Sequence, residues 1–316
     1  MKDITSYTDL RAIYTDTLID LGKSDERVLV LEADLMSATG TKPFKDAYPN
    51  RLINCGVAEA NMVGVASGLS SQGFIPFVNT FGCFATRRAY DQFFLSANYA
   101  RQNVKLIGSD PGVTATYNGG THMPFCDAAL TRVIPDIVVV EPGDGYSLHH
   151  LLKAVYAHSG SIYMRLQRKG NPIVHNKDTK FELGKGIVVQ DGSDVTLIAT
   201  GALMLSQAIE AAKELAKENI KAAVIDMHTI KPLDEELTLA FAKKTGAIVT
   251  CENAQMIGGL GGAVSEFLSG TAPTIVRRVG VQDLFGEVGQ LDYLIDRFEL
   301  TPERIIQEAK KAISLK

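Results

Sequence analysis

Arg27-Val28-Leu29-Val30-Leu31 is a short apolar run of the kind that forms a buried β-strand, and the fold follows from the recurrence of such runs. Similar runs occur at residues 74–78, 104–107 and 136–140, each separated from the next by a stretch compatible with a helix. Strands that alternate with helices are typical of βαβ units, in which the strands run parallel. The first part of the chain is therefore predicted to be an α/β domain.

A second series of the same kind begins at Val195-Thr196-Leu197-Ile198-Ala199-Thr200. Before it, residues 170–186 are polar and rich in turn-forming residues, which indicates a linker. The second series is predicted to continue with a helix at 202–217, a strand at 222–226, a helix at 234–244, a strand at 247–250 and a helix that opens after the glycines of 258–262. We expect two doubly wound α/β domains.

Composition excludes several classes of function. Of the 316 residues 46% are hydrophobic and 22% charged, with a formal net charge of −4, as in packed globular proteins. No basic run suits nucleic acid. The polar, charged N-terminus and the lack of a long apolar run predict a cytoplasmic protein without a membrane partner. The four cysteines lie far apart, without CxxC pairs, which favours reduced thiols and no metal site.

Glu59 lies in an unusually apolar stretch, residues 54–69, which is predicted to form a helix of small and apolar residues. None of its helical neighbours offers a countercharge, and a carboxylate on such a face loses solvation unless a polar group is brought to it. The ordinary alternative is a solvated glutamate at a helix start, where the helix dipole favours it. Because the glycines and alanines would let a ligand approach closely, we expect Glu59 to be functional.

Two phenylalanines and a histidine follow predicted strands, at the edge where open α/β sheets bind ligands. Phe81 and Phe84 come directly after the strand at 74–78 and would form an aromatic wall for a flat ring, although two Phe three apart are more often core. His122 lies in a glycine-loosened loop, from which it can donate a hydrogen bond to a substrate oxygen.

Arg165 lies near the end of a predicted strand, on the face opposite Ile162, Met164 and Leu166. The planar guanidinium suits an oxyanion, and a surface ion pair would explain this arginine equally well.

Two glycine motifs resemble cofactor sites and are interpreted otherwise. Residues 258–262 follow a strand and precede a helix, yet they do not fit GxGxxG followed by an acidic ribose ligand. Gly143-Asp144-Gly145 with Asn171 downstream imitates a metal-diphosphate motif, but Pro172 stands where that motif has a second asparagine. We interpret both as coincidental.

Six stretches in collinear order resemble the C-terminal half of transketolase in its split, two-subunit form: 33–35, 56–62, 80–92, 120–122, 164–166 and 227–234. The resemblance covers essentially the whole chain. It implies a thiamine diphosphate pyrimidine-binding domain over 1–180 and a transketolase C-terminal domain over 186–316. It also implies thiamine diphosphate as cofactor and a partner N-terminal subunit that holds the diphosphate and most of the Mg²⁺, in an α2β2 assembly that acts on sugars.

The resemblance also implies roles for particular residues. Glu59 matches the glutamate that bonds the aminopyrimidine nitrogen, and Phe81 and Phe84 match the aromatic pocket around that ring, in which a third aromatic of some members is Arg87 here. The sugar-contacting histidine matches His122. Further matches are the arginines that grip the terminal phosphate, at Arg165 and Arg11, and an acidic residue near the cofactor, at Asp34.

Three positions among the residues that would contact the sugar depart from the family pattern. Asn118 stands where an aspartate reads the donor's hydroxyl, Ser109 replaces a histidine, and Ala38 aligns with a phosphate-binding serine. We therefore predict a transketolase subunit that transfers a two-carbon ketol unit between anionic sugars, either with a non-standard donor such as a sulfonate or with ordinary specificity if Ser37 or Thr39 supplies the missing hydroxyl. The alternatives are an enzyme like 1-deoxyxylulose 5-phosphate synthase or a 2-oxo acid dehydrogenase β subunit, and a non-catalytic assembly subunit.

Overall fold

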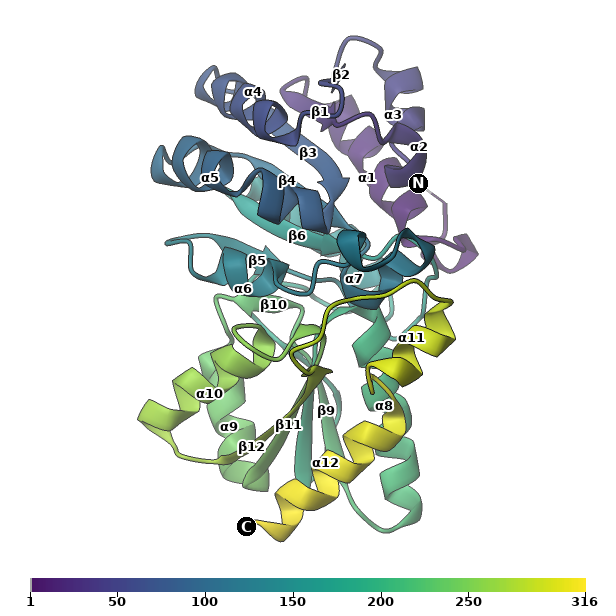
Figure 1. Cartoon of the computed structure of the whole chain (residues 1–316), viewed down its shortest axis with the longest axis vertical. Helices are drawn as coiled ribbons and strands as arrows, with labels where there is room; N and C mark the ends of the chain where they lie inside the picture. Colours follow the sequence, from purple (N-terminus) through teal and green to yellow (C-terminus); the bar gives the residue numbers. More distant parts are fainter. Residues whose placement is uncertain (1) are drawn as a thin grey trace.

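Two sheets, each covered by helices on both faces, lie one beyond the other along the long axis of the molecule (Figure 1). This computed structural model describes residues 2–316. The first sheet has seven strands in the order β10-β5-β6-β4-β3-β1-β2, and the second has five in the order β12-β11-β8-β9-β7. The predicted pair of α/β sheets is confirmed.

Apart from β10, the first sheet and its helices come from the N-terminal part of the chain. Its strands are β1 Val28–Glu32, β2 Leu52–Asn54, β3 Ile75–Phe81, β4 Lys105–Ser109, β5 Val138–Val140, β6 Ile162–Leu166 and β10 Thr229–Lys231. Its α-helices are α1 Leu10–Ser24, α2 Met36–Thr39, α3 Lys42–Ala47, α4 Glu59–Ser71, α5 Tyr90–Gln92, α6 Asp127–Arg132 and α7 Gly145–Ala157. Shorter helical segments are η1 Ile4–Ser6, η2 Phe84–Arg88, η3 Phe93–Tyr99, η4 Gly112–Asn118 and η5 Gly120–His122.

The second sheet is built from the C-terminal part of the chain. Its strands are β7 Ile187–Gln190, β8 Val195–Ala199, β9 Ala222–Asp226, β11 Ala247–Gln255 and β12 Ile275–Val281. Its helices are α8 Gly201–Lys217, α9 Glu235–Thr245, α10 Leu260–Thr271, α11 Leu291–Arg297 and α12 Pro302–Ser314. In Figure 1, α9 and α10 cover one face of this sheet, and α8 and α12 cover the other.

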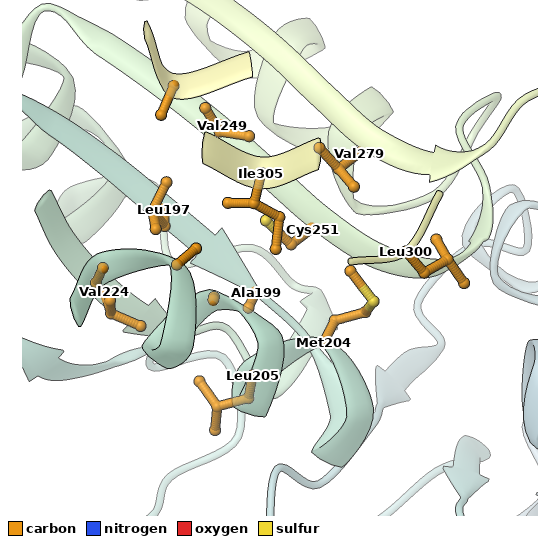
Figure 2. Packing of buried hydrophobic residues seen from close by; sticks show 14 of the residues in the cluster. Leu197, Ala199, Met204, Leu205, Val224, Val249, Cys251, Val279, Leu300 and Ile305 are labelled. Atoms are coloured by element: carbon orange, nitrogen blue, oxygen red, sulfur yellow. The ribbon is translucent and has the colours of Figure 1, made fainter. Parts of the chain in front are cut away.

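The central strands are apolar along their whole length because helices cover both faces of each sheet. Every residue of β1, β8 and β9 is buried. One of the cores lies between the second sheet and helices α8 and α12, where Leu197, Val249 and Ile305 pack together (Figure 2). This burial is what the short apolar runs of the sequence predicted.

Each sheet carries one antiparallel strand at an edge, so the sheets are mixed and not purely parallel. β7 pairs antiparallel with β9, and β10 pairs antiparallel with β5. β10 follows β9 in the chain yet joins the first sheet, so the second domain contributes a strand to the first. Between β6 and β7, the predicted linker contains no regular element.

Within residues 2–316, no helix has both the length and the apolar character needed to cross a membrane. All four cysteines are free thiols. Burial raises the pKa of Cys83 to about 11, so this thiol stays protonated at neutral pH.

Candidate active site

The carboxyl edge of the first sheet carries several of the predicted residues. β1, β3, β4 and β6 are parallel neighbours, so their carboxyl ends open onto one edge. Phe81 ends β3 and lies in register with Ser109, which ends β4. Asp34 follows β1 by two residues. Open α/β sheets bind ligands at such an edge.

Glu59 is held by an arginine that the sequence did not indicate. It is the first residue of α4, because β2 ends at Asn54 and the helix begins five residues later than predicted. Its carboxylate is buried, and Nη1 of Arg88 donates to both oxygens, at 3.0 and 2.9 Å. As expected, no countercharge comes from its own helix, and the cation that pairs with it is brought by η2.

Phe81, Phe84 and His122 form a cluster of rings. The ring centroids of the two phenylalanines are 6.1 Å apart, and the His122 ring lies 5.7 Å from Phe81 and 5.1 Å from Phe84. The Arg88 guanidinium carbon lies 4.1 Å from the Phe84 ring centre, so the cluster continues to Glu59. Arg87 donates to the carbonyl of Thr121 at 2.8 Å and so holds the His122 turn.

Two arginines meet at the other end of the ring cluster. Nη1 of Arg168 donates to the Ala38 carbonyl at 3.0 Å, and Nη1 of Arg11 donates to the same oxygen at 3.4 Å. Nε of Arg168 also donates to Asp110 at 2.5 Å, and its guanidinium carbon lies 5.3 Å from the centre of the Phe81 ring. A continuous line of contacts therefore joins Glu59 to Arg11.

Arg165 lies elsewhere, and the structure contradicts its assignment to the substrate. Its side chain is 0% exposed at the junction of the two domains. The guanidinium donates to Asp127 at 2.8 Å, to Glu141 at 2.5 Å and to the Asn253 carbonyl at 2.9 Å. Burial lowers the pKa of Arg165, but the two carboxylates outweigh burial and hold the pKa above its ordinary value. Because both faces of a parallel sheet are covered, the face opposite the apolar one is buried as well.

The three remaining predicted residues differ in exposure. The Ser109 hydroxyl is buried and has no hydrogen-bond partner within residues 2–316. Asn118 is exposed at the end of η4, two residues after Thr116, whose φ of 47° is unusual for a residue with a branched Cβ. Asp34 is exposed and exchanges two hydrogen bonds of 3.0 Å with Asn54, the last residue of β2.

Each of the two glycine motifs lies at the start of a helix whose backbone N–H groups are bonded by a carboxylate of this chain. Asp144 caps α7 by accepting from the backbone N–H of Ser147 at 2.8 Å, and its second oxygen accepts from two N–H groups of the linker. The Glu252 carboxylate lies at the N-terminus of α10, where it accepts hydrogen bonds from the backbone N–H groups of Leu260 and Gly261 at 2.8 Å each. In the described part of the chain, no three His, Cys, Asp or Glu side chains are arranged to hold a metal ion.

Sequence reasoning missed Arg88 and Arg168. Arg88 comes four residues after Phe84, a spacing that lets its side chain return over the ring within one helical segment. Arg168 comes just past the end of β6, where loops at the carboxyl edge carry binding groups. Arg165, inside the strand, belongs to the core.

The chain matches two family models in succession. The transketolase pyrimidine-binding domain matches residues 6–172, and the transketolase C-terminal domain matches residues 184–305. The chain belongs to the transketolase family.

Its relatives include components of split transketolases. A 6-deoxy-6-sulfo-D-fructose transketolase subunit, SqwH, of Clostridium sp. (strain MSTE9) is 47% identical over 97% of this chain and 95% of its own length. One of the subunits of an apulose-4-phosphate transketolase, from Phocaeicola vulgatus, is 34% identical over 86% of this chain and 87% of its own length. A solved split-gene transketolase, described as an inactive β4 tetramer, superimposes with a TM-score of 0.90 at 40% identity, covering 98% of this chain and 99% of that one.

Proposed function

We propose that this chain is the pyrimidine-binding subunit of a thiamine diphosphate-dependent transketolase that moves a two-carbon ketol unit between sugars. The observation that carries the proposal is the line of contacts from Glu59 through the ring cluster to Arg168 and Arg11. Along it lie a buried carboxylate paired with Arg88, two phenylalanine rings that both contact an imidazole, and two further cations at the far end. These are the groups needed to bind a heteroaromatic ring at one end and an anionic sugar at the other.

The Glu59 end of this line fits the aminopyrimidine ring of thiamine diphosphate. When bound, this cofactor supplies a carbon nucleophile that carries the two-carbon unit. Glu59 would hold a proton at a ring nitrogen, for which a buried carboxylate in a fixed position is suited. Phe81 and Phe84 would pack against the ring, and the Ser109 hydroxyl at the same edge, which has no partner among residues 2–316, would be available to a ligand. Asp34, which is hydrogen-bonded to Asn54 at the end of β2, is proposed to lie near the cofactor.

The other end of the line fits the sugar. His122, in contact with both phenylalanine rings, would donate to a sugar oxygen, and Asn118 on the same segment would read a hydroxyl. We assign the terminal anion to Arg11 and Arg168 in place of Arg165, because the first two are only partly buried and converge on one carbonyl oxygen. Forked guanidinium groups bind oxyanions through paired hydrogen bonds.

We propose that the donor is a ketose with a terminal sulfonate. The relative with 47% identity belongs to a transketolase for a sulfonated fructose. Ala38 offers no hydroxyl to a terminal phosphate, and the Thr39 hydroxyl beside it is donated to Glu32 at 2.7 Å. Asn118 can both donate and accept where an aspartate only accepts, which changes the hydroxyl pattern that this position reads.

The chain is proposed to act only with a diphosphate-binding partner subunit, which also holds most of the Mg²⁺, in an α2β2 assembly. Two of its relatives are described as subunits, and the solved β4 tetramer of a split-gene relative is described as inactive. A chain that carries one end of the cofactor site requires the other end from its partner.

The test is a donor comparison with the reconstituted complex. The chain is co-expressed with the N-terminal subunit of its host, and kcat/KM is measured for 6-deoxy-6-sulfofructose, xylulose 5-phosphate and an uncharged ketose, with an aldose phosphate as acceptor. The complex with Glu59→Gln is the control for cofactor-dependent transfer. We expect the sulfonated donor to give the highest kcat/KM. A much higher kcat/KM for xylulose 5-phosphate would contradict the sulfonate assignment. Absence of transfer from every donor would contradict the proposed function.

A further inference from the structure

The segment from Pro111 to Phe125 carries Asn118 and His122, and it packs into the second domain although it belongs to the first in sequence. Its apolar side chains Val113, Ala115, Met123 and Phe125 are part of the hydrophobic core that also contains β11, α11 and α12. The Phe125 ring lies 5.3 Å from that of Phe298, edge to face. The second domain therefore packs against the segment that carries the residues proposed to contact the sugar.

Asn253, near the end of β11, holds the start of this segment. Its side chain is buried, and both ends of the amide are used: Oδ1 accepts from the N–H of Val113 at 3.0 Å, and Nδ2 donates to the carbonyl of Pro111 at 2.9 Å. Gly112 lies between these two bonds with a φ of 54°, and a Cβ there would come within 2.1 Å of the Asn253 oxygen. Only glycine fits against this amide.

The end of β11 also holds the other end of the segment. The N–H of Gln255 donates to the carbonyl of Phe125 at 2.8 Å. The Asn253 carbonyl accepts from Arg165, whose guanidinium is fixed in turn by Asp127 and Glu141 of the first domain. The two ends of the segment are thus tied to one strand, and that strand is tied back to the first sheet.

A third contact lies at the tip of the segment. Gly120 is so close to the loop after β12 that an added Cβ would lie 2.0 Å from the Gly286 carbonyl oxygen. Conversely, a Cβ on Gly286 would lie 2.5 Å from Sδ of Met123, one residue after His122. The turn that presents His122 is thus packed directly against the second domain.

We propose that the second domain sets the position of the substrate-contacting segment, with Asn253 as the positioning residue. The inference rests on the proposed role of His122 in binding the sugar. The proposal predicts that the cofactor end and the sugar end of the site respond differently to changes at Asn253. Glu59, Arg88 and Phe84 lie outside the segment, so activation of the cofactor does not depend on Asn253, whereas the placement of His122 and Asn118 does.

The expected consequence of releasing the segment is a loss in sugar binding. Removing two buried hydrogen bonds that close the segment against β11 should speed local opening by about 5- to 100-fold. A substrate-positioning group displaced by about 1 Å costs on the order of 100-fold in rate. We expect Asn253→Ala to raise the donor KM and to lower kcat/KM by about 10- to 100-fold.

Two variants and two matched controls test this. Asn253→Ala removes the hydrogen bonds, and Gly286→Ala pushes on Met123, and so on the tip of the segment, from the loop after β12. Thr196→Val removes a buried hydrogen bond, to Thr245, at the far end of the second sheet. Gly270→Ala makes the same change as Gly286→Ala at a glycine with open space around it. Should Asn253→Ala fail to fold, Gly286→Ala decides the question.

Two readouts are taken. Hydrogen exchange of residues 111–125 is measured in the isolated chain, and in the reconstituted complex the donor KM is measured beside exchange of the reactive carbon-bound proton of thiamine diphosphate.

We expect faster segment exchange in Asn253→Ala, a raised donor KM in both variants, and cofactor proton exchange at the wild-type rate. Both control variants should behave like the wild type. Any of three results would overturn the positioning role. These are unchanged segment exchange in Asn253→Ala, an unchanged donor KM in both variants, or cofactor proton exchange slowed as much as transfer. A wild-type complex with no transfer at all would contradict the proposed function, and the exchange data on the isolated chain would still decide whether Asn253 holds the segment.

Discussion

Replacing Arg165 should destabilise the chain, whereas replacing Arg168 should mainly weaken binding of an anionic donor. In Arg165→Met the guanidinium that neutralises Asp127 and Glu141 is lost, and all three side chains are at most 5% exposed. Breaking a buried ion pair by removing one partner costs about 3–5 kcal/mol, because it leaves an uncompensated charge. With an unfolding entropy of about 2.1 cal/mol/K per residue, that corresponds in a chain of 316 residues to a fall in Tm of roughly 5–8 °C.

Arg168→Met removes a guanidinium that is 13% exposed and has one carboxylate partner, Asp110. Asp110 still faces Arg11 and Lys169, both of which act to lower its pKa. We therefore expect a smaller loss of about 1.5 kcal/mol, the low end for a hydrogen bond to a charged group. The donor KM should instead rise by about 10- to 100-fold for an anionic sugar, since the lost contact is charge-assisted.

The assay pairs thermal unfolding of the isolated chain with donor kinetics of the reconstituted complex. Each variant is measured with an anionic and an uncharged ketose. An Arg165→Met chain that melts within about 2 °C of the wild type, and that loses affinity for the anionic donor alone, would refute the assignment of Arg165 to the core. Equal losses on both donors for Arg168→Met would remove Arg168 from the anion site.

Three further predictions concern single side chains. Glu59→Gln should lower the transfer rate by about 10²- to 10⁴-fold, because an amide keeps the shape but cannot share the proton; if cofactor proton exchange in the reconstituted complex kept its wild-type rate, Glu59 would be structural. Burial raises the pKa of Glu32 from 4.5 to about 7, against hydrogen bonds from Thr41 and Thr39 that lower it. The folded chain therefore binds this proton more tightly than the unfolded chain, and the stability contributed by Glu32 is lost as pH rises from about 4.5 through 7. Urea denaturation of Glu32→Gln should show its stability relative to wild type improving between pH 5 and pH 8, and a pH-independent difference would exclude this origin. Asn118→Asp should raise kcat/KM for xylulose 5-phosphate relative to the sulfonated donor by about fivefold, the value of one hydrogen bond; an unchanged ratio would place Asn118 outside the specificity shell.

The sequence was sufficient for the longer buried parallel strands, because each is a short apolar run closed by turn residues, but β2, β7 and β12 were not predicted. β9 runs from Ala222 to Asp226, the range predicted from the sequence. β10 was not predicted as a strand because three residues carry too little pattern, and its pairing with β5 depends on the arrangement of the two domains.

The ring cluster was predictable because Phe81, Phe84 and His122 all follow strands that end at one edge. The partners of charged groups were not, because they come from segments distant in sequence. Glu59 and Arg88 are 29 residues apart, and Arg165 is 88 residues from the Asn253 carbonyl that it bonds. Periodicity within one element indicates which way a side chain faces, and the tertiary fold decides what it meets there.

The most direct test of the proposed split cofactor site is calorimetric titration of thiamine diphosphate with Mg²⁺ into this chain, into its N-terminal partner subunit, and into an equimolar mixture of both. If the pyrimidine end of the site lies on this chain and the diphosphate end on the partner, tight binding appears only in the mixture. Tight, magnesium-dependent binding to this chain alone would contradict the account and would make Gly143-Asp144-Gly145 the first place to look for the diphosphate site.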